Sequence, residues 1–504
     1  NGCSNLTEIN LPSSISEIGA GAFHGCSNLG HITLSSEGAL SSFSSSFNSC
    51  KDNAEIEFKD VESIPAESFN GCAWLNASII IPTTVTKIGA NAFNGCSQLA
   101  EINLPSNVSN IENAAFYGCS NLEHITLSSE EALSSFRSSF DSCKDNAKIE
   151  IKDVKSIPVE SFKGCSWLKE VSIDIPTTVT NIGDNAFEGC SGLTELYIPA
   201  SVVNIGNCVF DNCTNLSKID VDSNNKIYKS LDGFLLSKDS SKLIRCLEGK
   251  KGSVKLPDNV DSISSYAFSG CKKLSSVTMN ENLKTISEYA FKNCTGLTSI
   301  NIPSSVTEIG DGVFSGCTNI TSATLNNSDV LEKFKSIFMN CSNLNTVIIG
   351  NSVDTIPDNT FNGWSNLNSI SIGDNVVLIG DSAFSDCVKL STVTIPSKVS
   401  LIYRSAFSGC KELTNVNIFG DLNYVGQEAF ADCTKLNNFT YQGTRAPLYD
   451  DPGKNVFSNC PLLEKVSVPK DYKGSTFCGH QTTKGKSAKE KFDENIGWWL
   501  SSIG

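Results

Sequence analysis

Apolar and polar positions recur along the chain with a period of about 23 residues. In the unit that begins near 99, the stretch LAEINLP alternates apolar and polar residues, as a half-buried strand does, and Pro105 ends it by removing a backbone donor. Val108 and Ile111 follow on the opposite wall, and the phrase AFYGC predicts a tight turn that is closed by Gly118. Each unit therefore predicts one coil that returns to its start.

Phenylalanine marks this period through most of the chain, in steps that are mostly 22 to 25 residues long. The series comprises Phe23, Phe47, Phe69, Phe93, Phe116, Phe140, Phe162, Phe187, Phe210, Phe268, Phe291, Phe314, Phe338, Phe361, Phe384, Phe407, Phe430 and Phe457. Because one such unit cannot bury its apolar face alone, a fixed period of this size predicts a repeat solenoid with a continuous core. We expect stacked parallel strands on one wall and short strands, turns or 3-10 turns on the other.

The period also predicts the organisation of the chain. Residues 3–96 and 96–190 align nearly residue by residue, which indicates two duplicated blocks of four repeats. The rhythm breaks after Phe210, where Asp232-Gly233 predicts a hairpin turn. We expect regular repeats at 1–213, a variant coil with a hairpin-like insertion at 214–270, regular repeats at 271–469, and a cap and tail at 470–504. The chain begins inside a repeat, so we expect it to be a piece of something longer.

The strand phrase LxxIxIP, the phrase VxxIG and the turn AFxGCxxL together resemble the BspA-like class of leucine-rich repeat proteins. The segments YKSLDGFLLSKDSSKLIRC and VPKDYKGSTFCG are similar to those of cell-surface members from mucosal protist parasites. The resemblance implies a curved solenoid with its parallel sheet on the concave face. It also implies a cell-surface or secreted protein that adheres to an extracellular protein or glycan, with no catalytic residue carried by the motif.

Charge and hydropathy exclude several other classes. The net charge of -15 and the pI of about 4.9 argue against nucleic acid and anionic membrane surfaces as partners, because both attract basic patches. No run of apolar residues approaches the length that spans a bilayer. The oligomeric state has no signal in the sequence.

The 21 cysteines are explained by the repeat rather than by chemistry. Seventeen stand three residues after a phenylalanine of the series, and Trp364 replaces the cysteine once. Indole can replace a buried apolar residue but not a metal ligand or a nucleophile, and no CxxC pair is present, so we expect packing thiols and no metal site. Stacking distances alone leave disulfides open. Cys208, Cys246 and Cys478 lie outside the series and are better candidates for a bridge.

Catalytic residues are not visible in the sequence. His31 and His124 occupy equivalent positions in duplicated blocks, 93 residues apart, so they do not form one site. We therefore expect a protein without enzymatic activity and without a cofactor. A hydrolase site in the variant coil, between Asp232 and Arg245, is kept as a remote alternative.

The outward face of the strands offers the candidate binding residues. In the first half its positions carry charges, at Glu8, Glu55, Glu57, Glu101, Lys148, Glu150, Glu170 and Glu195. In the second half the same positions are neutral, and our candidates are Ser322, Thr324, Thr346, Ser369, Ser371, Thr392, Thr394, Asn415, Asn417, Asn438 and Thr440. Neutral residues suit strands whose stacked like charges would repel, but an array of hydroxyls and amides also suits recognition by many hydrogen bonds. Both interpretations stay open.

These observations predict a non-enzymatic adhesin or interaction protein that binds a host or microbial protein or glycan through an extended solenoid face. The alternative is a structural or intracellular scaffold for protein–protein interaction, which a need for reduced thiols would favour.

Overall fold

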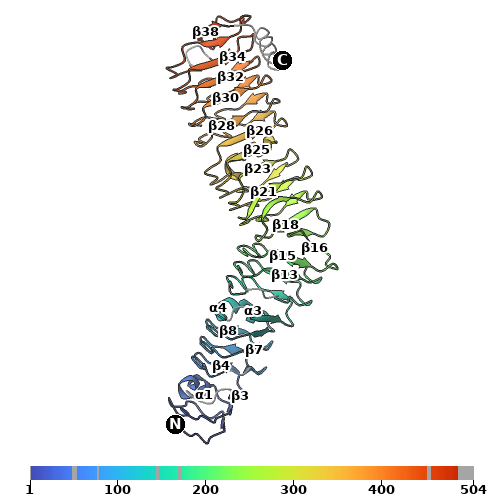
Figure 1. Cartoon of the computed structure of the whole chain (residues 1–504), viewed down its shortest axis with the longest axis vertical. Coiled ribbons are helices and arrows are strands. Elements are labelled where there is room, and N and C mark those ends of the chain that lie inside the picture. Colours follow the sequence, from blue (N-terminus) through green and yellow to red (C-terminus); the bar gives the residue numbers. More distant parts are fainter. Residues whose placement is uncertain are drawn as a thin grey trace, which may run out of the picture. The chain divides into compact units, whose positions relative to one another are not determined.

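The computed structural model describes residues 2–47, 54–75, 79–143, 147–168, 173–450 and 456–485. Its chain forms two compact units, Asn1–Lys250 and Lys251–Gly504, and the boundary between them in the sequence falls within the predicted variant coil. Each unit is a stack of coils in which parallel strands follow one another along one wall (Figure 1). The predicted repeat solenoid is confirmed.

In the first unit the strand wall is built of short parallel strands. They are β1 (Glu8–Leu11), β2 (His31–Leu34), β3 (Glu55–Phe58), β5 (Ile79–Ile80), β7 (Glu101–Leu104), β9 (His124–Leu127), β10 (Lys148–Ile151), β13 (Glu195–Ile198) and β15 (Lys218–Val221). The described part of the opposite wall carries two-residue strands, β4 (Ser63–Ile64), β6 (Lys87–Ile88), β8 (Asn110–Ile111), β11 (Ser156–Ile157), β12 (Asn181–Ile182) and β14 (Asn204–Ile205). Both walls pair in parallel, coil upon coil.

The second unit repeats this plan. Its strand wall contains β19 (Gly252–Lys255), β21 (Leu274–Thr278), β23 (Ser299–Ile302), β25 (Ser322–Leu325), β26 (Thr346–Ile349), β28 (Ser369–Ser371), β30 (Thr392–Ile395), β32 (Asn415–Ile418), β34 (Asn438–Tyr441), β36 (Val466–Val468) and β38 (His480–Lys484). Its opposite wall contains β20 (Ser262–Ile263), β22 (Thr285–Ile286), β24 (Glu308–Ile309), β27 (Thr355–Ile356), β29 (Leu378–Ile379), β31 (Leu401–Ile402), β33 (Tyr424–Val425) and β35 (Leu448–Tyr449). β37 (Thr476–Phe477) pairs antiparallel with β38.

The alternation read from the sequence matches the burial of these strands. In β7, Ile102 and Leu104 are fully buried, whereas Glu101 and Asn103 are exposed. The strand ends at Leu104, directly before Pro105, as predicted. Because the register is parallel and unshifted, apolar residues stack on apolar residues from coil to coil, and polar residues stack on the outside.

The AFxGC turns use the phenylalanine and the cysteine together, as the coils of Phe69, Phe93 and Phe116 show. The rings form a stack, with centroids 4.9 Å apart for Phe69 and Phe93 and 5.1 Å apart for Phe93 and Phe116. The Phe93 carbonyl accepts the backbone N–H of Cys96 in its own coil and the thiol of Cys119 in the next coil, at 3.2 and 3.3 Å. The cysteine is thus a buried donor as well as a packing residue, which the sequence analysis did not anticipate.

The thiol bond recurs in both units. Cysteines of the series along the described part of the chain donate to the carbonyl of the phenylalanine one coil earlier, at 2.9 to 3.3 Å; they include Cys96, Cys119, Cys143, Cys190, Cys213, Cys294, Cys317, Cys341, Cys387, Cys410, Cys433 and Cys460. Burial raises the pKa of the Cys119 and Cys387 thiols to about 12. The described cysteines, including Cys208, Cys246 and Cys478, are not joined by disulfides.

The turn requires left-handed backbone at the residue before the cysteine. Gly118 has φ +70° there, so the predicted closing glycine is confirmed. Several coils place Asn or Asp at the same position, such as Asn293 and Asp386, with φ near +58°. Asn and Asp are the side chains that tolerate this conformation best after glycine.

Three coils carry a pair of short helices that the sequence analysis did not specify. They are α1 (Glu37–Ser41) with α2 (Phe43–Ser46), α3 (Glu130–Ser134) with α4 (Phe136–Ser139), and α5 (Ser328–Glu332) with α6 (Phe334–Ile337). The first helix of each pair is capped by a side chain, which Ser129 shows by accepting from Ala132 N at 3.0 Å. In each case a tryptophan of the following coil packs on the phenylalanine that begins the second helix. The ring centroids of Trp364 and Phe334, for example, are 4.9 Å apart.

Trp364 explains how one coil omits its cysteine. Its ring packs edge-on against Phe334, and its Nε1 donates to the carbonyl of Leu344 at 3.1 Å. The indole therefore fills the cysteine position and supplies a donor, although to a different carbonyl.

The predicted hairpin-like insertion is a three-stranded antiparallel element of the first unit. β16 (Tyr228–Leu231) and β17 (Phe234–Ser237) pair across the Asp232-Gly233 turn, and β18 (Lys242–Cys246) pairs with β17. The predicted boundaries at 213, 270 and 469 stay predictions. Most of the predicted tail, 486–504, lies outside the described residues.

Replacement of Cys410 by alanine tests the double role of the thiol. The side chain is fully buried, and its thiol donates to Phe384 O at 3.2 Å. Loss of the sulfur and of the bond should lower the free energy of unfolding by about 1–2 kcal/mol, measured by urea unfolding. The exposed Cys3, replaced in the same way, is the control and should change stability little. Equal effects of C410A and C3A would refute a stabilising role for the thiol series.

Candidate functional site

All eleven candidate residues lie on the strand wall of the second unit. Strands β25, β26 and β28 carry the first five in one sheet, and β30, β32 and β34 carry the other six in the next sheet, side by side in Figure 1. Their side chains are exposed or half-buried, because each occupies an outward position of its strand. We call this set, Ser322 to Thr440, the neutral face. The structure therefore brings the predicted residues together, coil after coil.

The neutral face is held in register by backbone pairing. Thr392, Asn415 and Asn438 are direct partners in neighbouring strands, about 4.8 Å apart. The amide of Asn438 donates to the Asn415 Oδ1 at 2.9 Å, and the amide of Asn415 donates to the Thr414 hydroxyl at the same distance. This chain of side-chain bonds orders the amides before any ligand arrives.

The outward face of the first unit differs in charge. Glu195 and Lys218 are register partners, and their charged atoms lie 3.6 Å apart, while Asp220 lies 2.5 Å from Lys218. Hydrogen bonding to Asp220 raises the pKa of Lys218. Of the predicted first-half residues, Glu170 lies outside the described part of the chain. From β23 to β34 of the second unit, the same outward positions carry no charge.

A polar groove borders the neutral face where the strands begin. It has a volume of about 470 Å³, and its lining includes Asn345, Asn368 and Ser391, each directly before a residue of the neutral face. The sequence analysis missed these positions because it considered only the fifth and seventh residues after each cysteine. The signal was available in the sequence. Asparagine occupies the second and fourth positions after Cys341 and again after Trp364, in two consecutive coils.

Comparison with known proteins supports a family assignment. A family model described as a BspA type leucine-rich repeat region matches residues 1–80, 62–174, 136–231, 248–366 and 334–464. The chain belongs to the BspA-type leucine-rich repeat family. The comparison with curated proteins gives no match.

Solved structures similar to this BspA-type chain include three bacterial proteins. A leucine-rich repeat protein from Bacteroides ovatus is 29% identical over 80% of this chain and 88% of its own, with a TM-score of 0.43. The pneumococcal vaccine antigen PcpA is 21% identical over 68% and 86%, with a TM-score of 0.42. A leucine rich cell surface protein from Faecalibacterium prausnitzii is 23% identical over 84% and 87%, with a TM-score of 0.33.

Membership of this family indicates an interaction scaffold, because a stack of repeats presents a long surface rather than an enclosed pocket. Repeat solenoids of this kind are typically non-enzymatic. No helix in the described part of the chain is long and apolar enough to cross a bilayer.

Two histidines of the BspA-type repeats, His31 and His124, lie on the charged face of the first unit. His31 Nδ1 lies 3.5 Å from a Glu55 oxygen, and its Nε2 lies 3.6 Å from a Glu57 oxygen. His124 has Glu101 and Lys148 as its register partners, so the duplicated block replaces one acid with a base. Across the described residues, no group of three His, Cys, Asp or Glu side chains has metal-binding geometry.

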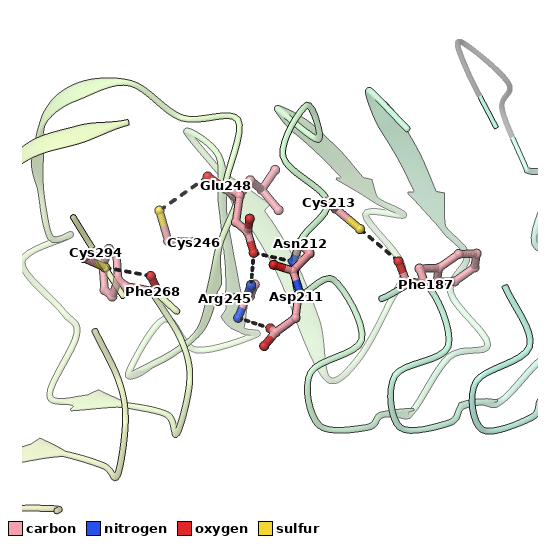
Figure 2. A network of polar contacts seen from close by, with 10 residues as sticks. Phe187, Asp211, Asn212, Cys213, Arg245, Cys246, Glu248, Phe268 and Cys294 are labelled. Atoms are coloured by element: carbon pink, nitrogen blue, oxygen red, sulfur yellow. Dashed lines mark hydrogen bonds and ion pairs between the residues drawn. The ribbon is translucent and has the colours of Figure 1, made fainter. Parts of the chain in front are cut away.

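The variant coil contains a buried charge cluster (Figure 2). Arg245 is 5% exposed, and its guanidinium lies 2.6 Å from Asp211 Oδ1 and 3.0 Å from Glu248 Oε1. Glu248 Oε1 also accepts the backbone N–H of Asn212 at 2.7 Å. Burial raises the pKa of Asp211, although the neighbouring guanidinium opposes this effect. The cluster ties the antiparallel insertion to the preceding regular coil.

The hydrolase alternative receives no support from this arrangement. Asp232 is exposed in the turn between β16 and β17, whereas Arg245 is buried among carboxylates. The charges of the buried cluster are used in ion pairs and a backbone contact that hold the variant coil together.

Replacement of Arg245 by alanine should destabilise the first unit strongly. The two carboxylates would stay buried without the guanidinium between them, which costs about 3 kcal/mol or more in the free energy of unfolding. Lys242 lies on the same strand with its side chain exposed, so Lys242→Ala is the matched control. Urea unfolding followed by circular dichroism measures both variants, and equal midpoints would show that the cluster contributes nothing.

Proposed function

We propose that this BspA-type solenoid is a non-enzymatic interaction protein, exposed at the cell surface or secreted, that binds an extracellular ligand through the neutral face. Family membership supports a role in interaction. The resemblance of its repeat and insertion segments to those of cell-surface members supports the location. The ligand we propose is a protein or a glycan of a host or of another microbe.

The contrast between the two outward faces carries the proposal. If the fold required neutral outward residues, the first unit would lack charges at these positions. Instead it pairs Glu195 with Lys218 and places His31 between Glu8 and Glu55 in neighbouring strands. The fold therefore tolerates charged residues at outward positions when their partners in the neighbouring strands are oppositely charged or neutral. The neutrality of β23 to β34 is then a property of that surface, which supports selection for hydroxyls and amides in register.

Free thiols are compatible with an extracellular location. The reactive species is the thiolate, and burial holds the pKa of thiols such as Cys119, Cys165 and Cys341 near 12. Oxidation requires thiolate character and access, and the buried thiols of the repeat have neither. The free thiols therefore give no specific support to the intracellular scaffold.

Alanine at Thr392, Thr394, Asn415 and Asn417 together tests the neutral face. Each lost hydrogen bond to a ligand is worth about 0.5–1.5 kcal/mol, so binding should weaken at least tenfold, with the melting temperature shifted by no more than about 2 °C. Binding to immobilised matrix glycoproteins and to neutral oligosaccharides is measured by biolayer interferometry.

The control for this experiment is a pair on the face of the first unit, Glu101→Ala with Lys148→Ala, which removes exposed side chains from equivalent strand positions. Binding of the control should equal that of the unaltered protein. Unchanged binding by the quadruple variant, or equal losses in both variants, would contradict recognition by the neutral face.

Resistance to oxidation discriminates the extracellular proposal from the intracellular alternative. After incubation of the native protein with oxidised glutathione at pH 7.4, mass spectrometry should find the exposed Cys3 modified and the buried Cys119 and Cys410 unmodified. The same treatment in urea should modify all three. Modification of Cys119 in the native protein at the rate of Cys3 would favour a reducing compartment.

A further inference from the structure

The polar groove beside the neutral face is built on four consecutive coils. Its lining runs from Asn343 and Asn345 through Asn366 and Asn368 to Glu412. Three steps of about 4.8 Å separate the first coil from the last, so the groove extends for roughly 14 Å along the stack. Such a length suits a chain of several units better than a single small molecule.

The floor of the groove is fixed by bonds between coils. Asn343 Nδ2 donates to Thr318 O at 2.8 Å, and Asn366 Nδ2 donates to Ser342 O at 2.9 Å. Lys389 Nζ then donates to Asn366 Oδ1 at 2.8 Å. Side chains held in this way lose little further freedom when a ligand binds, which lowers the cost of binding.

Both charged side chains of the lining already have partners. Lys389 is bonded to Asn366, and the two oxygens of Glu412 accept from Lys435 Nζ at 2.8 and 2.6 Å. The lining therefore presents one paired cation and one paired anion among amides and hydroxyls. Phosphate and sulfate recognition uses clusters of free cationic donors, which this lining does not present.

Two amides remain for a ligand. Asn345 Oδ1 accepts the Thr346 hydroxyl at 2.9 Å, and its Nδ2 forms no hydrogen bond within the described part of the chain. The side chain of Asn368 is exposed and likewise forms none among the described residues. A side-chain amide offers two N–H donors and one carbonyl acceptor, so the pair can both donate and accept.

We propose that this groove binds a neutral oligosaccharide, an inference that rests on the proposed function and names its ligand class. Sugar hydroxyls donate and accept hydrogen bonds, which matches the amides of Asn345 and Asn368 and the hydroxyl of Ser391. A peptide helix would need an apolar groove, and a peptide strand would need an open sheet edge. The lining is polar, β26 and β32 beside it are paired on both sides, and β28 and β30 lie against each other where the two sheets adjoin.

The double variant Asn345→Ala, Asn368→Ala tests the groove in the full chain. The probes are immobilised neutral oligosaccharides of glucose, galactose, mannose and N-acetylhexosamine, beside sialylated and sulfated versions. The unaltered protein should bind at least one neutral probe, nearly independently of salt, and the double variant should bind it roughly tenfold or more weakly.

Asn437→Ala is the matched control, because Asn437 is an exposed asparagine at the same coil position outside the groove lining. Its affinity for the probe and the melting temperatures of both variants should be unchanged. Equal losses in the double variant and the control would overturn the proposal. So would preference for the sulfated probes, or binding to matrix polypeptide without any neutral glycan.

Failure of this inference is distinguishable from failure of the proposed function. If the quadruple variant of the neutral face loses binding to a matrix protein while the double groove variant keeps it and no glycan binds, the groove proposal is wrong and the proposed function stands. If the unaltered protein binds none of the proteins or glycans, both are wrong.

Discussion

The turn that joins Phe to Cys is the contact on which the rest of each unit depends. Within it, one carbonyl, such as that of Phe93, accepts from the cysteine N–H of its own coil and from the thiol of the next. The Phe93 ring stacks on the Phe116 ring of the following coil, and the Phe93 backbone N–H donates to a carbonyl of that coil. Coil spacing, strand register and the outward direction of the polar positions all follow from this repeated contact.

Much of the fold could be predicted from the sequence because its determinants are local. The alternation in LAEINLP, the stop at Pro105 and the left-handed turn at Gly118 each depend on neighbouring residues, and all were confirmed. The thiol hydrogen bonds were missed because burial alone explained the cysteines. Trp364 was interpreted correctly as a replacement for a packing residue, but its bond to Leu344 O depends on the neighbouring coil.

What could not be predicted depends on residues that are distant in sequence. Asp211 lies in the coil before the antiparallel insertion and Arg245 in its last strand, and no period relates them. Their cluster joins the insertion to the regular turn at Phe210, whose ring still stacks on Phe187, so charge pairing is added there to the repeated contact. The groove was missed for another reason, since its amides precede the fifth and seventh residues after each cysteine, which were the positions considered. Which of these amides are fixed depends on side-chain bonds between coils, and the sequence does not show those bonds.

The separation of inward and outward positions explains how such a surface can acquire specificity. Inward residues such as Ile102 and Phe116 cannot change without loss of packing on two neighbouring coils. Outward residues contribute little to stability, so their side chains can vary while the register stays fixed. A ligand that spans several coils then meets many weak contacts whose geometry the core has already set. Because each contact is small, affinity depends on their number in register, and on our proposal a change of two amides in the groove would alter recognition without altering the fold.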